Sequence, residues 1–188
     1  MMLAIDLGCC AGGASMGLSR AGFELLGVDI EPQPEYPFRF IQADALEFDF
    51  SAADFVWASP NCQPFSVGTA GIRKQGKVYP DWLPQIRQRL QQSGLPYIIE
   101  NVPGAPLLNP IRLWGQQFGL SLVRCRLFES NLLLLAPPPR TPTSGIFHRG
   151  RPSERHPAGM AGSHANAVGF GEAQTVSGRA ACLFRVFG

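Results

Sequence analysis

The sequence has no long apolar run, and no basic segment followed by one. A signal peptide and a membrane-spanning helix are therefore not supported, and we expect a cytoplasmic protein with no membrane partner. The sequence also lacks the Gly-x-Gly-x-x-Gly spacing of nicotinamide-binding proteins, which argues against a dehydrogenase. An odd number of cysteines, with Cys9 and Cys10 adjacent, argues against a disulfide framework.

Histidine is scarce, and the cysteines are poorly spaced for a metal. His148, His156 and His164 recur every eight residues, a period that fits neither one helix face nor a pair of metal ligands. The cysteines other than Cys62 do not have the spacing of zinc ligands either. We therefore expect no metal site.

The net charge is only +2, but it is unevenly distributed. Residues 1–135 contain ten basic and twelve acidic residues, whereas residues 136–188 contain six Arg and two Glu and are rich in Pro and Gly. We predict a catalytic domain over residues 1–135 and a basic, partly irregular extension over residues 136–188, which is either a solvated linker or a phosphate-contacting arm. The candidate phosphate contacts are Arg140, Arg149, Arg151 and Arg155 in the extension, and Arg73, Lys74 and Lys77 in a second patch.

A Gly-rich turn follows the first expected strand. Residues 3–7 are a strand-length apolar run, residues 8–17 are a small-residue turn that opens a helix, and residues 24–29 read as a second strand ending at Asp29. An acidic residue about 20 positions after a Gly-rich turn is where the ribose of a nucleotide-type cofactor is held. The alternative is that the turn is merely the tight connection that any βαβ unit needs.

A cysteine lies in a Pro-rich loop directly after another apolar run. Residues 54–58 predict a short buried strand, and Pro60 and Pro64 stop regular structure, so Cys62 lies on a stiff loop at the carboxyl end of that strand. Ligands bind at this edge of open α/β sheets. The position suits a nucleophile, although a lone cysteine is more often a small buried side chain.

Two more strands are expected to end in carboxylates, at Asp44 and Glu100, and Glu100 is costly to bury unless it is paired. Two helices are expected to cover the sheet. One is capped by Asp81 and ends near Gly94, and the other spans residues 110–118. Each expected helix contains one tryptophan, Trp82 and Trp114, and both are interpreted as core aromatics in preference to base-stacking platforms.

Six motifs occur in the order found in one enzyme family. They are Asp-Leu-x-Cys-x-Ala-Gly-Gly (6–13), Gly-Val-Asp-Ile-Glu-Pro (27–32), Gln-Ala-Asp-Ala (42–45), Ser-Pro-x-Cys-Gln-Pro-Phe-Ser (59–66), Glu-Asn-Val (100–102) and Arg-x-Arg-Leu-Phe-Glu (124–129). With these motifs the chain resembles the C5-cytosine DNA methyltransferases, in particular compact phage-type members. The resemblance covers roughly residues 3–138. It implies an α/β, Rossmann-like, S-adenosylmethionine-dependent methyltransferase fold with a largely parallel sheet.

The resemblance also implies a mechanism and its catalytic residues. Cys62 adds to C6 of a cytosine flipped out of DNA, which makes C5 nucleophilic enough to accept the methyl group. Glu100 holds the N3 and amino edge of the base, Arg126 contacts its O2 side, and Arg124 is the structural partner of Arg126. Alternatives are methylation of a free cytosine nucleotide and an inactive DNA- or cofactor-binding remnant. We expect a monomer with DNA as its partner.

The cofactor implied by the resemblance is S-adenosylmethionine. The Gly-rich turn would approach its methionine part, Asp29 its ribose, Ile30 one face of its adenine, and Asp44 with Ala45 the adenine edge. The full predicted cofactor-binding set is Asp6, Leu7, Gly8, Cys9, Cys10, Ala11, Gly12, Gly13, Asp29, Ile30, Asp44, Ala45 and Pro60.

The chain departs from the family pattern at several positions. Cys10 stands where glycine is usual, and Gly8 stands where Phe or Cys is usual. Asn61 replaces the Pro that normally precedes the nucleophile, which is expected to loosen the loop. Only about sixty residues follow Arg126, too few for the usual recognition and closing segments, so a truncated or frame-shifted end is a further expectation.

Overall fold

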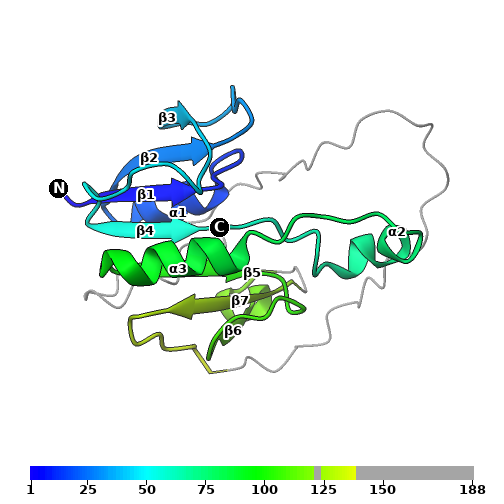
Figure 1. The fold of residues 1–188 in the computed structure, drawn as a ribbon. Helices are drawn as coiled ribbons and strands as arrows, with labels where there is room; N and C mark the ends of the chain where they lie inside the picture. Colours follow the sequence, from blue (N-terminus) through cyan, green and yellow to red (C-terminus); the bar gives the residue numbers. More distant parts are fainter. Residues whose placement is uncertain (121–123, 139–188) are drawn as a thin grey trace.

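Seven strands form one sheet in the order β3-β2-β1-β4-β5-β7-β6 in the computed structural model, which describes residues 1–120 and 124–138 (Figure 1). Strands β3, β2, β1, β4 and β5 run parallel, whereas β7 is antiparallel to both β5 and β6. The predicted α/β fold with a largely parallel sheet is confirmed. The elements are β1 (Leu3–Leu7), α1 (Gly13–Arg20), β2 (Glu24–Asp29), β3 (Arg39–Gln42), β4 (Phe55–Ala58), the 3-10 helix η1 (Val67–Thr69), α2 (Ala70–Lys74), α3 (Leu83–Ser93), β5 (Tyr97–Asn101), β6 (Ile111–Trp114), the 3-10 helix η2 (Gly115–Phe118) and β7 (Cys125–Ser130).

Helices cover both faces of the sheet, and the alternation of side chains along each strand supplies both cores. In β1, Ile5 and Leu7 belong to the apolar cluster that contains Leu90 of α3, whereas Ala4 belongs to the cluster that contains Leu18 of α1. Figure 1 shows α3 in front of the sheet and α1 behind it. Because both faces are buried, the strands are nearly continuous apolar runs, which is why they could be found from the sequence.

The strand order reverses between β1 and β4. From β1 the chain adds β2 and β3 on one side, and after β4 it adds β5 on the other. Loops leaving β1 and β4 therefore diverge and leave a crevice at their carboxyl ends. This places the Gly-rich turn after Leu7 beside the Cys62 loop after Ala58, because Leu7 and Ala58 are paired in register.

The helix expected after Asp81 is present as α3. The Oδ1 atom of Asp81 accepts a hydrogen bond from the Leu83 N–H at 3.0 Å, and the helix ends at Gly94, which has a φ of +68°. Ile86 and Leu90 are buried on one face, as predicted. Trp82 is only half-buried, so its interpretation as a core aromatic is wrong.

The helix expected over residues 110–118 is wrong: the segment forms strand β6 followed by the short helix η2. Leu113 pairs with Arg126 in β7, a partner that is distant in the sequence. That pairing satisfies the backbone hydrogen-bonding groups of β6, so the tertiary contacts outweigh the local signal for a helix. Trp114 at the end of β6 is 38% exposed, which also contradicts its predicted place in the core.

The predicted extension begins near the last described residue. Residues 139–188, with the three histidines, Cys182 and the arginines of the proposed phosphate-contacting arm, lie outside the described residues. The division at residue 135 therefore stays a prediction. In the part of the chain that the structure describes, no helix combines the length and apolar character needed to cross a membrane.

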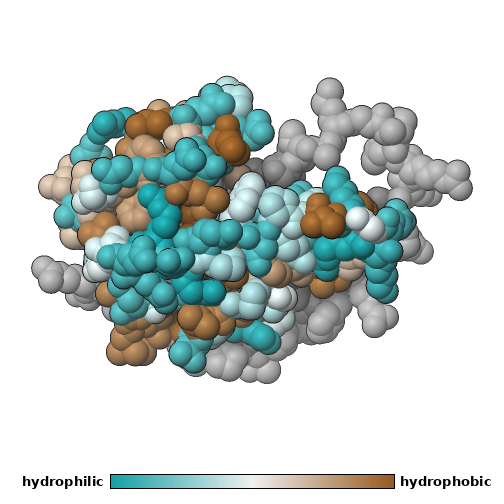
Figure 2. All heavy atoms as spheres, viewed as in Figure 1, coloured by the Kyte–Doolittle hydropathy of each residue, from teal (hydrophilic) through white to brown (hydrophobic). Residues whose placement is uncertain are grey.

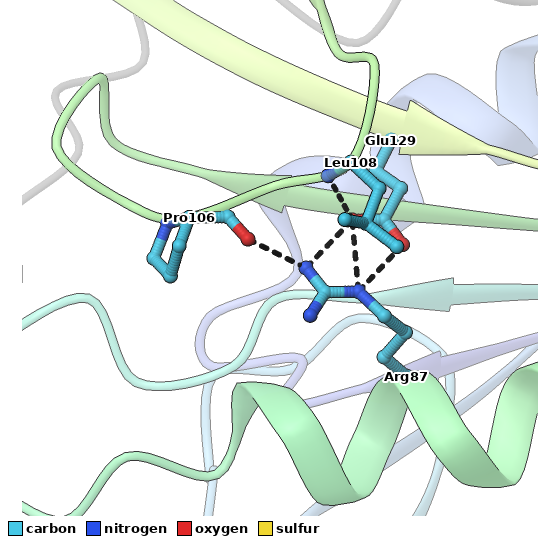
Figure 3. Close-up of polar contacts among 4 residues, drawn as sticks. All are labelled: Arg87, Pro106, Leu108 and Glu129. Atoms are coloured by element: carbon cyan, nitrogen blue, oxygen red, sulfur yellow. Dashed lines mark hydrogen bonds and ion pairs between the residues drawn. The ribbon is translucent and has the colours of Figure 1, made fainter.

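A buried ion pair fastens the antiparallel strands to the rest of the domain (Figure 3). Arg87 of α3 donates from Nε to Oε1 of Glu129 in β7 at 2.8 Å, and from Nη2 to Oε2, also at 2.8 Å. Glu129 is 2% exposed and also accepts from the Leu108 N–H, while Arg87 donates to the carbonyl of Pro106. The fork geometry and the extra hydrogen bonds offset the cost of burying the charges.

We expect Arg87→Met to lower the free energy of unfolding by about 3–5 kcal/mol, because it leaves the Glu129 carboxylate buried without a counter-charge. Urea denaturation monitored by circular dichroism measures the loss. The control is Arg39→Met, which removes an exposed ion pair with Glu24 and is expected to cost less than about 1 kcal/mol. Equal losses in the two variants would contradict a structural role for the buried pair.

Candidate active site

The antiparallel direction of β7 brings its first residues to the carboxyl edge of the parallel strands. Glu100 in β5 pairs with Phe128, and Asn101 pairs with Leu127. Arg126 and Arg124, which precede this pairing, therefore lie next to the end of β5 and close to the loop that follows β4. Sequence positions far apart along the chain thus meet at one edge of the sheet.

Glu100 and Arg126 form a short ion pair. Arg126 Nε lies 2.6 Å from Glu100 Oε1, and the two side chains are 20% and 22% exposed. Burial raises the pKa of Glu100 above its usual range, and the positive charges of Arg126 and Arg124 act against that rise. A hydrogen bond from Ser59, in the loop after β4, also stabilises the charged form. The carboxyl group is therefore held in place while remaining easier to protonate than an exposed Glu.

Arg124 connects this pair to the cysteine. Partial desolvation and the neighbouring charge of Arg126 lower the pKa of Arg124, whereas Glu100 and Cys62 act in the opposite direction. The side chain of Arg124 is thus within electrostatic reach of both the carboxylate and the thiol. The structure brings all four residues predicted as catalytic into one cluster.

Cys62 is exposed, and the turn that follows it is well defined. Its carbonyl oxygen accepts hydrogen bonds from the N–H groups of Phe65 at 3.0 Å and Ser66 at 2.9 Å. The buried Asn101 donates from Nδ2 to the carbonyl of Pro60 at 3.0 Å, which ties the end of β5 to this loop. A Cβ atom on Gly104 would lie 2.5 Å from the Phe65 carbonyl oxygen, so only glycine allows the two loops to approach this closely.

Asn61 contributes hydrogen bonds where the family pattern has proline. Its Oδ1 accepts from the Gln63 N–H at 3.0 Å, and its Nδ2 donates to the Pro80 carbonyl at 3.2 Å. The first bond is the local turn that an Asn side chain makes with the backbone two residues later. The loosening expected from the loss of proline stays a prediction, and these bonds act against it.

A pocket opens between the Gly-rich turn and the loop after β4, at the point where the strand order reverses. Seven of the predicted cofactor-binding residues line it, namely Leu7, Gly8, Asp29, Ile30, Asp44, Ala45 and Pro60. The other six, Asp6 and residues 9–13, belong to the adjoining strand and turn and do not line it. The residues that the sequence interpretation missed are Leu46, Ala58, Ser59, Asn61, Trp82 and Ile86.

The backbone of the Gly-rich turn has a positive φ at three positions, Gly8, Cys10 and Gly12. Gly8 has a φ of +77°, and a Cβ atom there would lie 2.8 Å from the Ser59 carbonyl oxygen. Cys10, which stands where the family pattern has glycine, also has a positive φ of 45°. Its N–H donates to Asp29 Oδ2 at 3.0 Å, and partial desolvation with the nearby charge of Asp29 raises the pKa of the exposed Cys10 thiol to about 11. A thiol with a raised pKa is rarely ionised near neutral pH, which argues against Cys10 as the nucleophile.

Asp6 lies at the centre of a buried polar network. Its Oδ2 accepts from Ser15 Oγ at 2.5 Å, and Ser15 Oγ is in turn hydrogen-bonded to Tyr36 Oη at 2.6 Å. Its Oδ1 has no hydrogen-bond partner among the described residues, although Asp6 is only 1% exposed. Burial raises the pKa of Asp6 to about 7, and the charges of Asp29 and Glu100 add to that rise.

This pKa predicts a particular dependence of stability on pH. The folded-state pKa of Asp6 is above its unfolded value of 3.8, so its contribution to stability is complete below about pH 4 and is lost as the pH rises through 7. In Asp6→Asn this contribution cannot titrate. We expect the wild type to lose stability relative to Asp6→Asn between pH 4.5 and 7.5, on the order of 1 kcal/mol or more, as measured by urea denaturation at each pH. A difference between the two proteins that stays constant with pH would contradict a raised pKa.

Comparison with solved structures shows what kind of fold surrounds this site. A protein described as a DNA modification methyltransferase encoded within an E. coli prophage is 20% identical over 68% of this chain and 45% of its own, with a TM-score of 0.53. The described residues have a methyltransferase fold. The Dnmt2 methyltransferase of S. pombe is also 20% identical, over 72% of this chain and 52% of its own, with a TM-score of 0.49. The chain spans about half the length of these two proteins. No family model matches the chain, and no curated protein sequence matches it.

The methyltransferase fold confirms the predicted resemblance to DNA methyltransferases at the level of architecture. Within this fold the pocket adjoins the loop that carries Cys62, because both lie at the carboxyl ends of β1 and β4. Among the described residues, no three His, Cys, Asp or Glu side chains gather as a metal site requires. The individual roles assigned to the site residues stay predictions.

Proposed function

We propose that this chain carries the catalytic site of a DNA (cytosine-5-)-methyltransferase that uses S-adenosylmethionine. One observation supports this most directly. An exposed cysteine, a carboxyl group of raised pKa and two guanidinium groups meet beside a pocket at the point where the strand order reverses. These are the groups needed to attack a pyrimidine and to stabilise the charge that develops on its ring.

The pocket and its surroundings fit the proposed cofactor. Ile30 is 52% exposed and lines the pocket, so an apolar surface is available to one face of an adenine ring. Asp29, beside it, presents the carboxylate expected for ribose hydroxyls. When bound, S-adenosylmethionine supplies an electrophilic methyl group.

The side chains divide the proposed reaction between them. The Cys62 thiolate forms a bond to C6 of cytosine, and the electron pair displaced from the C5–C6 double bond moves toward N3 and O2. Glu100, which burial makes easier to protonate, gives a proton to N3, while the charges of Arg126 and Arg124 stabilise the O2 side. C5 would then take the methyl group as the bond between that group and the cofactor sulfur breaks. Water or a carboxylate removes the C5 proton, the N3 proton returns to Glu100, and departure of Cys62 restores the aromatic ring and the thiolate.

The test is incubation with cofactor labelled in its methyl group and, separately, with duplex DNA, single-stranded DNA and deoxycytidine monophosphate. We expect label in duplex DNA, recovered as 5-methyldeoxycytidine after nuclease digestion. Label in the mononucleotide and not in DNA would instead identify a free-nucleotide enzyme. Binding of cofactor or DNA without transfer to any substrate would identify an inactive binding protein.

A further inference from the structure

The segment after the Cys62 loop extends beyond the edge of the sheet. It contains η1 and α2, and Figure 1 shows α2 past the carboxyl ends of β1 and β4. Val67 and Val78 are 90% and 89% exposed, and Figure 2 shows apolar side chains over α2 among hydrophilic ones. Lys74 and Lys77 of this segment are exposed as well. The segment is therefore a positively charged projection next to the candidate nucleophile.

One side of the Arg73 guanidinium group, at Nη1, contacts the backbone of the turn that follows Cys62. Its Nη1 lies 2.8 Å from the Gln63 carbonyl oxygen and 2.7 Å from the Ser66 carbonyl oxygen. The Thr69 hydroxyl shares its one hydrogen between the same two oxygens, which lie 2.6 and 3.0 Å from its Oγ1. Ser66 in turn donates from its N–H to the Cys62 carbonyl. Arg73 and Thr69 thus fix the turn whose first residue is the candidate nucleophile.

The other edge of Arg73 is not used within the described residues. A guanidinium has five N–H groups, of which Nη1 carries two, and the structure records contacts of Nη1 only. Nε and Nη2 form a planar fork whose spacing matches two oxygens of a phosphate. Arg73 is half-buried, so this charge is not fully screened by water. The sequence predicted Arg73 only as part of a phosphate-contacting patch, and its contacts with the turn after Cys62 are an addition from the structure.

We infer that Arg73 binds one backbone phosphate of the nucleic acid substrate through Nε and Nη2 while its Nη1 holds the turn behind Cys62. This rests on the proposed function, because the phosphate belongs to the substrate of that site. Arg73 is a positioning residue: it acts on the reaction through the Cys62 loop. Binding of the substrate backbone would immobilise the guanidinium and, with it, the loop that carries the thiol.

The first test is amide hydrogen exchange of residues 63–69 in the full chain, with and without a short DNA duplex. In Arg73→Gln these amides are expected to exchange about tenfold faster than in the wild type, because the turn loses its charged donor. The duplex slows exchange in the wild type and has little effect in Arg73→Gln. Arg39→Gln removes the same charge from an exposed arginine of β3, outside this patch, and its exchange at residues 63–69 should match the wild type with and without DNA.

The second test is duplex affinity as a function of salt. Loss of one phosphate contact should flatten the log–log slope by about 0.9 in Arg73→Gln. Arg73→Lys keeps a charge that can serve the phosphate or the turn but not both, so it should retain the slope and lose the slowing of exchange by DNA. An unchanged slope in Arg73→Gln, or equal exchange in Arg73→Gln and Arg39→Gln, would overturn the inference.

These measurements do not require methyl transfer. A wild type that binds DNA without methylating it would contradict the proposed function while still testing Arg73. The wild type could instead methylate DNA while Arg73→Gln keeps the wild-type salt slope and amide exchange rates. That result would contradict the role of Arg73 and leave the proposed function intact. If the wild type binds no DNA at any salt concentration, the phosphate contact is also overturned.

Discussion

Cys62→Ser is expected to lower methyl transfer at least about 10³-fold while cofactor binding persists. A serine hydroxyl is far less acidic than a thiol and cannot form the adduct at C6, so C5 is never made nucleophilic. Cys62 is exposed and does not line the pocket, and the recorded hydrogen bonds of its loop come from backbone groups and from the side chains of Asn61, Thr69, Arg73 and Asn101. The substitution therefore removes the reactive atom and little else.

The measurement is initial rates with methyl-labelled cofactor, together with calorimetric titration of the cofactor. DNA containing 5-fluorocytosine should trap a covalent complex with the wild type and none with Cys62→Ser, because fluorine at C5 cannot leave as a proton does. Cys125→Ser is the matched control, since Cys125 is a half-buried thiol that lies outside the pocket. Near-normal methylation by Cys62→Ser would contradict covalent catalysis.

Glu100→Gln is expected to lower turnover by about 10²- to 10³-fold, with cofactor affinity changed far less. The amide has the shape of the carboxyl group but cannot deliver a proton to N3, and it pairs only weakly with Arg126. The contact strengthens as charge develops on the base, so its loss reduces kcat more than it raises KM. Glu100 does not line the pocket, which is why cofactor binding should persist.

Steady-state rates at varied DNA concentration separate these effects, and calorimetry again reports cofactor affinity. Glu100→Asp keeps a protonatable carboxyl group on a shorter side chain and should recover part of the lost turnover. A matching loss of cofactor affinity and turnover in Glu100→Gln would point to a folding defect instead. If Glu100→Asp recovers no activity and Glu100→Gln is fully active, the role of Glu100 as proton donor is contradicted.

The sequence by itself determined the parallel half of the molecule. Strands buried on both faces must be apolar runs, so β1, β2, β4 and β5 could be read directly from residues 3–7, 24–29, 54–58 and 96–102. Their carboxyl ends share one edge of the sheet, so the sequence alone predicts that Cys62, Asp29 and Glu100 lie at that edge. Local signals also located α3 through its cap at Asp81 and its end at Gly94.

Only the tertiary structure decided the antiparallel part and the electrostatics. β6 lies at the edge of the sheet and pairs only with β7 in the described strand order, so no local pattern indicated that residues 111–114 are a strand. Trp82 and Ile86 line the pocket because α3 packs against the sheet at that point. The raised pKa values of Asp6 and Glu100 come from burial, and the double role inferred for Arg73 comes from carbonyls in a neighbouring turn. Burial and non-local contacts are properties of the assembled chain, which is why a reading along the sequence could not supply them.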